Sequence, residues 1–185
     1  MNHLKQQVGD TLVEVTFAAV ILSAVLVSCF ALANLAYRQG ARAQERAQAA
    51  NLAQEQYEAL RTVRDSNPWD AVNGFANQIT TVTSGTTTCS DGTSGKCFYL
   101  YKDITNGGKW ALASGSYAPT QGGSSAPGVQ RVSIKVDNTV TAADGTTAYK
   151  VFGITAAWDP RGGSGPKELV EMKVVLANKD GLEPR

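Results

Sequence analysis

The chain has 185 residues, which is enough for one domain of ordinary size with its own hydrophobic core. Its 17 Lys and Arg residues balance 16 Asp and Glu residues, so it has neither the basic excess typical of nucleic-acid binding nor an acidic tail. Its single His is His3, and neither a nucleophile motif nor a phosphate loop occurs; we therefore expect no enzyme, no cofactor and no metal site.

Residues 10–37 form an apolar segment. No residue from 15 to 35 is charged, and about twenty helical residues cross a hydrocarbon core of about 30 Å. Glu14 stands where the uncharged run begins. A carboxylate costs about 2.5–3.5 kcal/mol near the middle of a membrane helix and less toward its end. Glu14 is therefore a candidate functional residue, and its partner must be a cation.

The residues around Glu14 carry a resemblance. A short polar leader (residues 1–9) ends in Gly9, and Thr-Leu-Val-Glu-Val at residues 11–15 follows; this arrangement resembles the type IV prepilin signature. The resemblance implies that a prepilin peptidase cuts between Gly9 and Asp10 and leaves the apolar helix on the subunit. It also places the assembly glutamate of the family at Glu14. Asp10 departs from the family pattern, in which a large apolar residue, usually Phe, begins the mature chain and is N-methylated.

Three other interpretations of the apolar segment stay open. A secretory signal peptide would be cut after Ala-Leu-Ala at residues 31–33, but the run is too long and Glu14 interrupts its start. A lipoprotein would be lipidated at Cys29, which follows Leu-Val-Ser, but the chain stays apolar beyond that cysteine. A plain single-span anchor is the third. We prefer the pilin-like interpretation.

Two arguments disagree about the side of the membrane on which the part of the chain after the span lies. Arg38, Arg42 and Arg46 follow the span, whereas Lys5 and the initial amine precede it, so a count of cations places the C-terminal part in the cytoplasm. Long domains translocate largely regardless of charge, however, and the leader and the cysteines favour the outside. We predict one N-terminal span in the cell (inner) membrane, an extracytoplasmic head, and later an extracellular or periplasmic filament.

Residues 38–66 continue with helical spacing and contain no Pro, with Gly40 as a soft point near the start. Asn67 and Pro68 end the pattern, because a residue before Pro avoids the α region. The predicted buried face comprises Ala43, Ala47, Ala50, Ala53, Tyr57 and Leu60. The predicted solvent face comprises Arg42, Glu45, Arg46, Gln54, Glu58 and Arg61.

Residues 67–128 form a Thr-, Ser- and Gly-rich connecting region with one strand-like run at 97–102. Cys89 and Cys97 bracket a polar loop with two glycines. Two cysteines fall short of the four ligands of a zinc site, so in an exported protein we expect them to close a small disulfide loop. Cys29 should stay a free thiol packed within the apolar helix.

Residues 129–185 alternate like an antiparallel sheet, with strands predicted at 129–136, 149–158 and 169–176. With the run at 97–102 this makes three or four strands and an α+β fold. The predicted architecture resembles that of minor pilins and pseudopilins. It has a long N-terminal helix, a variable middle, and a sheet whose penultimate strand ends in Trp. Residues 51–61 are also similar to the helix region of pilins.

Two sets of residues were weighed as ligand sites. Asp137, Asn138 and Asp144 offer oxygens for calcium but lack the spacing of a known loop, so we interpret them as turn residues. Lys102, Lys109 and Lys150 could meet DNA phosphates, but the balanced total charge favours solvated surface lysines.

The function expected from the resemblance is that of a structural subunit, a pilin or minor pilin, of a type IV pilus-like filament. Its partners would be other pilin subunits, the prepilin peptidase and the membrane. One alternative is a type II secretion pseudopilin built on the same plan. Another is a tip or adhesin-type binding subunit whose middle region, residues 74–127, contacts a surface, DNA or another cell.

Overall fold

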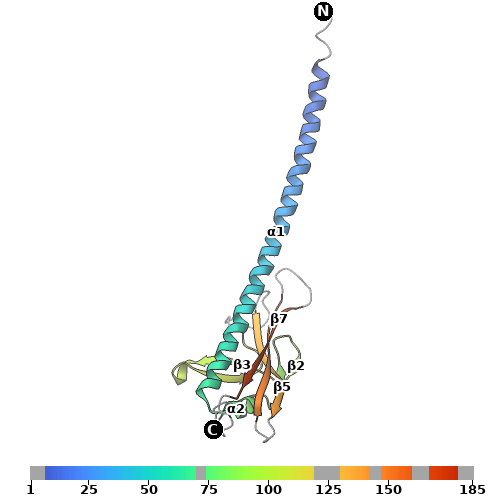
Figure 1. Cartoon of the computed structure of the whole chain (residues 1–185). Helices are drawn as coiled ribbons and strands as arrows, with labels where there is room; N and C mark the ends of the chain where they lie inside the picture. The colour runs from blue at the N-terminus through green and yellow to red at the C-terminus, as the bar shows by residue number, and fades with distance from the viewer. Residues whose placement is uncertain (1–6, 70–73, 119–129, 142–146, 160–166, 179–185) are drawn as a thin grey trace, which may run out of the picture. The chain divides into compact units, whose positions relative to one another are not determined.

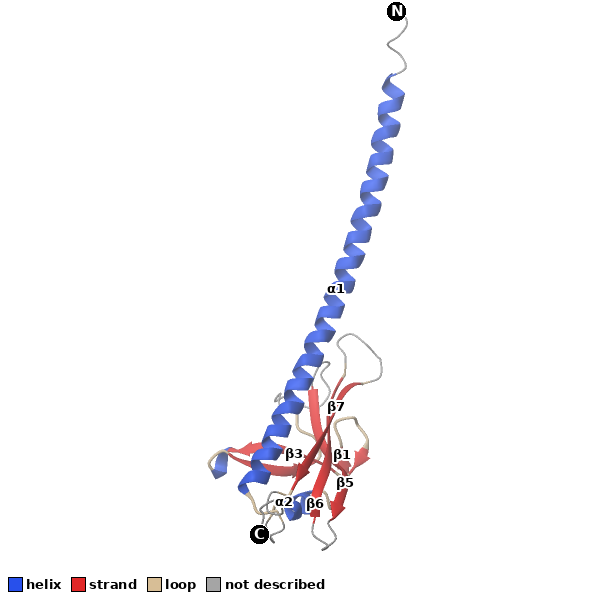
Figure 2. Cartoon of the chain, viewed as in Figure 1, coloured by secondary structure: helices blue, strands red, loops and turns tan. Residues whose placement is uncertain are grey.

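In a computed structural model of the chain, the described residues are 7–69, 74–118, 130–141, 147–159 and 167–178. The chain divides into two compact units, with the boundary between Gln44 and Glu45. The fold is α+β, as predicted (Figure 1, Figure 2). Its elements are α1 (Gln7–Ser66), α2 (Phe75–Val82), β1 (Thr87–Thr88), β2 (Ser94–Gly95), β3 (Cys97–Asp103), the 3-10 helix η1 (Ile104–Asn106), β4 (Lys109–Ser114), β5 (Gln130–Thr141), β6 (Thr147–Trp158) and β7 (Glu168–Ala177).

Helix α1 is unbroken over 60 residues and continues through Gly40. It ends at Ser66, as the Asn67–Pro68 sequence predicted, because Pro cannot continue the hydrogen-bond ladder. The last turn is closed by side chains: Asn67 Nδ2 donates to the carbonyl oxygen of Val63 at 2.7 Å, and Ser66 Oγ donates to the same oxygen at 3.2 Å. These bonds satisfy a carbonyl that the helix itself leaves without a partner.

The second unit, from residue 45 onward, is the head. Its main sheet has five antiparallel strands in the order β4-β3-β5-β6-β7, where the sequence predicted three or four. The additional strand is β4, whose short run with two alanines gave little alternation to detect. Helix α2 was also not predicted; it buries Phe75, Ala76 and Ile79.

One face of the sheet carries the core. The part of α1 in the head packs small and aliphatic residues, at helical spacing, against this face of the sheet. Helix α2 contributes the aromatic side chain of Phe75. Phe152 sits centrally, with its ring centroid 6.1 Å from that of Phe75 and 6.4 Å from that of Phe98, both edge-on. The α1 residues in this cluster are Ala49, Leu52, Ala53, Ala59, Leu60 and Val63.

The buried face of α1 is therefore rotated from the one predicted. Ala53 and Leu60 are buried as expected, but Ala43 and Ala47 are exposed. Glu45, which the sequence assigned to the solvent face, is 6 % exposed. Alanine occurs all round this helix, so its spacing alone does not mark the side that meets the sheet.

On the opposite face of the sheet, Gly153 makes room for a carboxylate. A Cβ on Gly153 would lie 3.0 Å from Asp137 Oδ1. Asp137 falls at a register shift between β5 and β6 and forms an ion pair with Lys173, whose Nζ is 3.6 Å from Asp137 Oδ2. The missing side chain of Gly153 thus admits this ion pair to the surface of the sheet.

Candidate membrane and assembly segment

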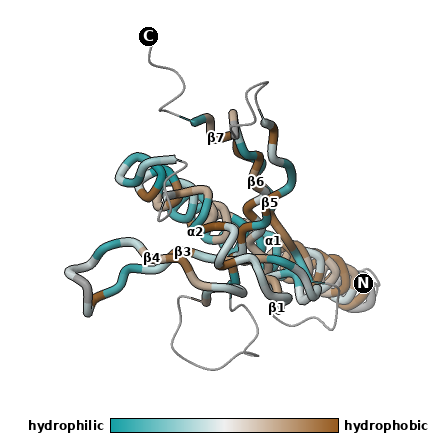
Figure 3. Tube along the Cα trace, turned by 90° about the horizontal axis from the view of Figure 1, so that it is seen from below, coloured by the Kyte–Doolittle hydropathy of each residue, from teal (hydrophilic) through white to brown (hydrophobic). Residues whose placement is uncertain are grey.

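Between residues 12 and 37, α1 consists mainly of exposed apolar residues. Every side chain from 12 to 40 is exposed, and the helix is coloured largely brown toward its N-terminal end in Figure 3. The largest of these exposed side chains are Leu12, Val13, Val15, Phe17, Val20, Ile21, Leu22, Val25, Leu26, Val27, Phe30, Leu32, Leu35 and Tyr37. A soluble protein seldom leaves such a surface in water, so this segment requires another apolar environment.

The segment is long and apolar enough to cross a membrane. At 1.5 Å per residue, the uncharged run from 15 to 35 extends roughly 30 Å, which matches the hydrocarbon thickness of a bilayer. This run lies within the apolar segment predicted from the sequence, residues 10–37.

The hydroxyl groups on this segment are satisfied by the helix itself. Thr16 Oγ1 donates to the carbonyl oxygen of Val13, and Ser23 Oγ donates to that of Val20, both at 2.8 Å. Ser28 Oγ bonds the carbonyl oxygen of Ala24 in the same way, also at 2.8 Å. Such bonds remove most of the cost of a hydroxyl in lipid or between packed apolar helices.

Glu14 is the only charged residue between positions 12 and 37, and its side chain is exposed on α1. Gly9 and Asp10 lie within the same helix, but their side chains are outside the described residues, as is the whole of residues 1–6. Positions 10 and 14 are one helical turn apart and share a face. An α-amine created at Asp10 would therefore lie within reach of the Glu14 carboxylate of its own chain.

Cys29 is a free cysteine, as predicted, but it is exposed and not packed. The sequence argument took an apolar helix to be a buried one. All described neighbours of Cys29 on α1 are exposed as well, so any packing of its thiol must come from lipid or from another chain.

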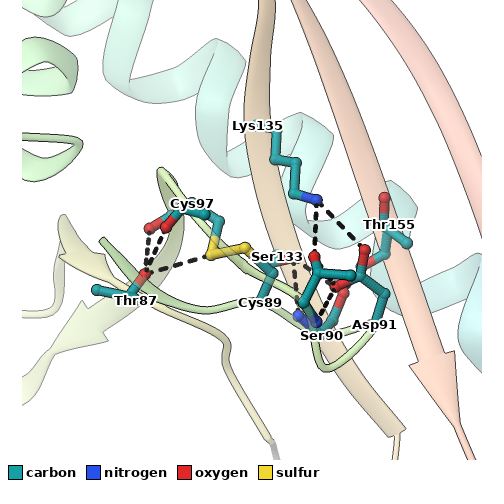
Figure 4. The surroundings of a disulfide bond; sticks show 10 residues. Thr87, Cys89, Ser90, Asp91, Cys97, Ser133, Lys135 and Thr155 are labelled. Carbon is teal, nitrogen blue, oxygen red and sulfur yellow. Dashed lines mark hydrogen bonds and ion pairs between the residues drawn. A yellow bond between two sulfur atoms is a disulfide. The ribbon is translucent and has the colours of Figure 1, made fainter. Parts of the chain in front are cut away.

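The disulfide predicted from the cysteine spacing is present and joins Cys89 to Cys97, whose Cα atoms are 5.8 Å apart (Figure 4). It closes the small hairpin of β1 and β2, in which Thr87 pairs with Gly95. Both cysteines are buried. The loop that the sequence described only as polar is thus a compact structure.

The disulfide loop is held to the sheet by buried hydroxyls. Ser90 Oγ lies 2.9 Å from Ser133 Oγ and donates to the carbonyl oxygen of Thr155 at 2.7 Å (Figure 4). The backbone N–H of Ser90 donates to Ser133 Oγ at 3.1 Å. No sequence pattern marked Ser90 or Ser133, because the bonds join positions that are far apart in the chain.

Asp91 adds an ion pair at the edge of this loop. Lys135 Nζ lies 3.2 Å from Asp91 Oδ2, while Thr93 donates to Asp91 Oδ1 from its hydroxyl at 2.7 Å and from its backbone N–H at 2.9 Å. Partial burial by itself would raise the pKa of Asp91. The bonds from Thr93 and the ammonium of Lys135 outweigh that effect and hold the pKa below its ordinary value of 3.8.

Two buried polar residues fix the head part of α1 to the sheet; the sequence assigned Glu45 to the solvent face and did not single out Gln56. Gln56 exchanges two hydrogen bonds with Leu100 of β3: its Nε2 donates to the carbonyl oxygen at 3.0 Å, and its Oε1 accepts from the N–H at 2.8 Å. Glu45 Oε2 accepts from Trp158 Nε1 at 3.2 Å. The available signal was their spacing, since both fall in register with Ala49 and Leu52.

Among the residues that the structure describes, the lysines and acidic residues weighed as ligands do not form one site. Lys150 is 8 % exposed, so the prediction of a solvated lysine is wrong there. Lys102 lies over the ring of Trp110, and Lys109 is exposed at the start of β4. Asn138 is exposed on β5, and Asp144 lies outside the described residues.

The candidate functional segment is thus the exposed apolar part of α1 with Glu14 near its start. It is accompanied by a head with its own core and a disulfide. In comparisons with protein-family models, with curated proteins and with solved structures, nothing matches this chain.

Proposed function

We propose that this chain is a structural subunit of a type IV pilus-like filament, cut from its leader between Gly9 and Asp10. The observation that carries the proposal is the first part of α1, where an uninterrupted exposed apolar surface has one charge, Glu14, near its start. The membrane covers this surface before assembly, and the same helices of neighbouring subunits cover it afterwards.

The proposal gives Glu14 a physical task. Cleavage after Gly9 leaves an α-amine on Asp10 with a pKa of about 7.7–8.0 in model compounds, so it is mostly cationic at neutral pH. Among apolar helices the amine and the carboxylate are each costly alone, and pairing offsets much of that cost. When the amine belongs to a neighbouring subunit, a shift along the helix leaves both charges unpaired, so the pair sets the register.

The disulfide supports a head that faces an oxidising compartment, since such bonds persist outside the cytoplasm. We therefore place the head on the extracytoplasmic side of the inner membrane. The same plan serves a pilus and a type II secretion pseudopilus. Immunogold labelling separates them, because a pilus subunit decorates filaments outside the cell and a pseudopilus subunit stays in the periplasm.

Mass spectrometry of the native N-terminus tests the proposal. We expect a mature chain that begins at Asp10, and Gly9→Leu should leave uncut precursor in the membrane because the peptidase needs a small residue there. Gly40→Leu is the matched control, since a side chain at Gly40 meets open space, and it should be processed normally. A chain lipidated at Cys29, a chain cut after Ala33, or normal maturation of Gly9→Leu would overturn the proposal.

A further inference from the structure

Strand β7 is a long edge strand of the main sheet. Its ten residues pair with β6 without a register shift, and among the described strands β7 pairs with β6 alone (Figure 3). Alternate N–H and C=O groups along β7 therefore point away from the sheet. Proteins commonly shorten such an edge or interrupt it with Pro or a bulge, because it otherwise pairs with another strand. Strand β7 has neither Pro nor a bulge in its pairing with β6.

The opposite edge of the sheet, β4, is better protected. It has six residues, begins with the exposed Lys109, and has α2 packed beside it. Strand β7 instead exposes two large apolar side chains on the face of the sheet turned away from α1, where Leu169 is 53 % exposed and Val175 is 60 % exposed. An open edge with apolar side chains beside it favours the addition of a partner strand.

The sequence of β7 is complementary to itself in the antiparallel direction. Along the face turned away from α1 the exposed side chains are, in order, Leu169, Glu171, Lys173 and Val175. An antiparallel copy centred on Met172 places each Glu171 opposite Lys173 of the other copy. The same register places each Leu169 opposite Val175. Opposite charges and apolar side chains that lie directly across two strands are the favourable pairs of antiparallel sheets.

A shifted register loses this match. Directly opposed residues point to the same face of a sheet, so a two-fold axis between two copies must pass through a residue. An axis at Glu171 places the two glutamates opposite each other and Lys173 opposite Leu169. An axis at Lys173 places the two lysines opposite each other and Glu171 opposite Val175. The axis at Met172 avoids both conflicts.

Both charged side chains are available to a partner. Glu171 is exposed, and none of the ion pairs among the described residues involves it. The side chain of Lys173 is 68 % exposed, and its Nζ lies 3.6 Å from Asp137 Oδ2. An ammonium group has three donors, so Lys173 can keep this contact and bind a second carboxylate.

We infer that β7 is a self-pairing edge, to which a second copy of this chain adds its own β7 antiparallel about a two-fold axis at Met172. The same surface is used by both copies, as in any two-fold interface. A strand of another protein would also find free backbone groups here, but the side-chain pattern of β7 matches its own sequence.

The pairing joins heads of opposite direction. The head part of α1 lies on one face of the sheet, and the two-fold axis is perpendicular to that sheet, so it reverses the direction of this part of α1 in the second copy. The contact therefore differs from the one proposed between the first parts of neighbouring α1 helices, which run in the same direction. The inference goes beyond the proposed filament role, and each holds if the other fails.

Disulfide trapping tests the register. The full chain carries Cys29→Ala, to remove its free thiol, and enough detergent is used that each micelle holds one chain. Directly opposed Cα atoms are about 4.5–5.5 Å apart, within the reach of a disulfide. We expect Met172→Cys to form a covalent dimer, and a mixture of Glu171→Cys with Lys173→Cys to form a mixed dimer. Either of the last two alone should cross-link at least about tenfold less, because its cysteines lie diagonally at about 7–8 Å.

Charge reversal, followed by sedimentation in the same detergent, tests the partner. Glu171→Lys places lysines opposite each other and Lys173→Glu places glutamates opposite each other, so each variant alone should self-associate about tenfold more weakly. A mixture of the two variants should recover the association as a mixed dimer, because every lysine again lies opposite a glutamate. Lys109→Glu, on the other edge strand, is the matched control and should stay within twofold of the unmodified chain.

Three results would overturn the inference. The first is a Met172→Cys chain that stays monomeric at millimolar concentration, whether its own residues or a strand of another protein occupy the edge. The second is cross-linking of Glu171→Cys alone that equals that of the mixture. The third is a mixture of folded charge variants that associates no better than either alone. If Lys173→Glu fails to fold beside Asp137, the pattern of cysteine cross-links decides.

Discussion

The two parts of α1 use the same secondary structure for opposite purposes. Residues 12–40 expose every side chain, and the large apolar ones among them have no covering element in the described chain. Residues 45–66 bury a stripe of small and aliphatic side chains in the core of the head and add polar bonds from Glu45 and Gln56. The second part needs only its own chain. The first part needs a membrane or other chains, and this difference is the basis of the proposed function.

The largest expected effect separates the two parts directly. Leu60 is fully buried, so Leu60→Ala should lower the free energy of unfolding of the head by about 2–5 kcal/mol through lost burial and a cavity. Leu26 is 61 % exposed, and Leu26→Ala should change the same quantity by less than about 0.5 kcal/mol. Urea unfolding followed by tryptophan fluorescence in detergent measures both. Equal losses would contradict the division.

Removal of the disulfide should have the next largest effect, again in the head alone. Replacing Cys89 and Cys97 by Ala should cost about 2–3 kcal/mol of head stability, because the bridge closes a loop of about nine residues in the unfolded chain. Cys29→Ala is the control, since its exposed thiol lies on the other part of α1, and it should leave the unfolding curve unchanged. A non-reducing peptide map with both thiols free in the mature protein would contradict the oxidising compartment assigned to the head.

Much of this comparison was predictable from the sequence, because the apolar, uncharged character of the first part of α1 is visible in its composition alone. An uncharged run with Glu14 at its start is visible without any partner. The end of α1 at Ser66 follows from local chemistry at Asn67 and Pro68, and the disulfide follows from cysteine spacing and turn residues.

The head part of α1 was less predictable for a physical reason. Glu45 and Gln56 look like solvent-facing residues until Trp158 and Leu100 supply their partners, and those lie far away in the chain. Strand β4 has a short, alanine-containing pattern, and Trp110 packs against the core only once the sheet has formed. The roles of Gly9, Asp10 and Glu14 stay predictions, because they depend on a peptidase and on neighbouring subunits.

Gln56 tests whether polar bonds fix the second part of α1. Gln56→Met keeps the volume but removes both bonds to Leu100, so the buried N–H and C=O of that residue lose partners. We expect a loss of about 1–3 kcal/mol in the free energy of unfolding. Gln54→Met, at an exposed position of the same helix, should stay within about 0.5 kcal/mol. If Gln56→Met is as stable as the unmodified chain, then apolar packing alone holds this part of α1 on the sheet.

The smallest effect expected is a pH dependence confined to the head. The pKa of Asp91 is lowered below 3.8 in the folded chain, so its ionised form contributes stability above the unfolded value. That contribution is lost as the pH falls through the lowered folded value. The urea midpoint of the unmodified chain should therefore decrease below about pH 4 more steeply than that of Asp91→Asn. If the urea midpoints of the two proteins change with pH in the same way, the ion pair between Asp91 and Lys135 does not contribute to stability.

The most direct test of the central claim is the assembly of Glu14→Ala. An acidic residue that serves only the dipole at a helix N-terminus is worth about 0.3–1 kcal/mol, so its removal would leave assembly normal. The pairing account predicts a subunit that is cut after Gly9 and stable in the membrane but missing from sheared filaments, and Glu14→Gln should behave in the same way. Glu58→Ala, which removes an exposed carboxylate from the head part of α1, should assemble normally. Incorporation of Glu14→Ala at the level of the unmodified chain would contradict the account.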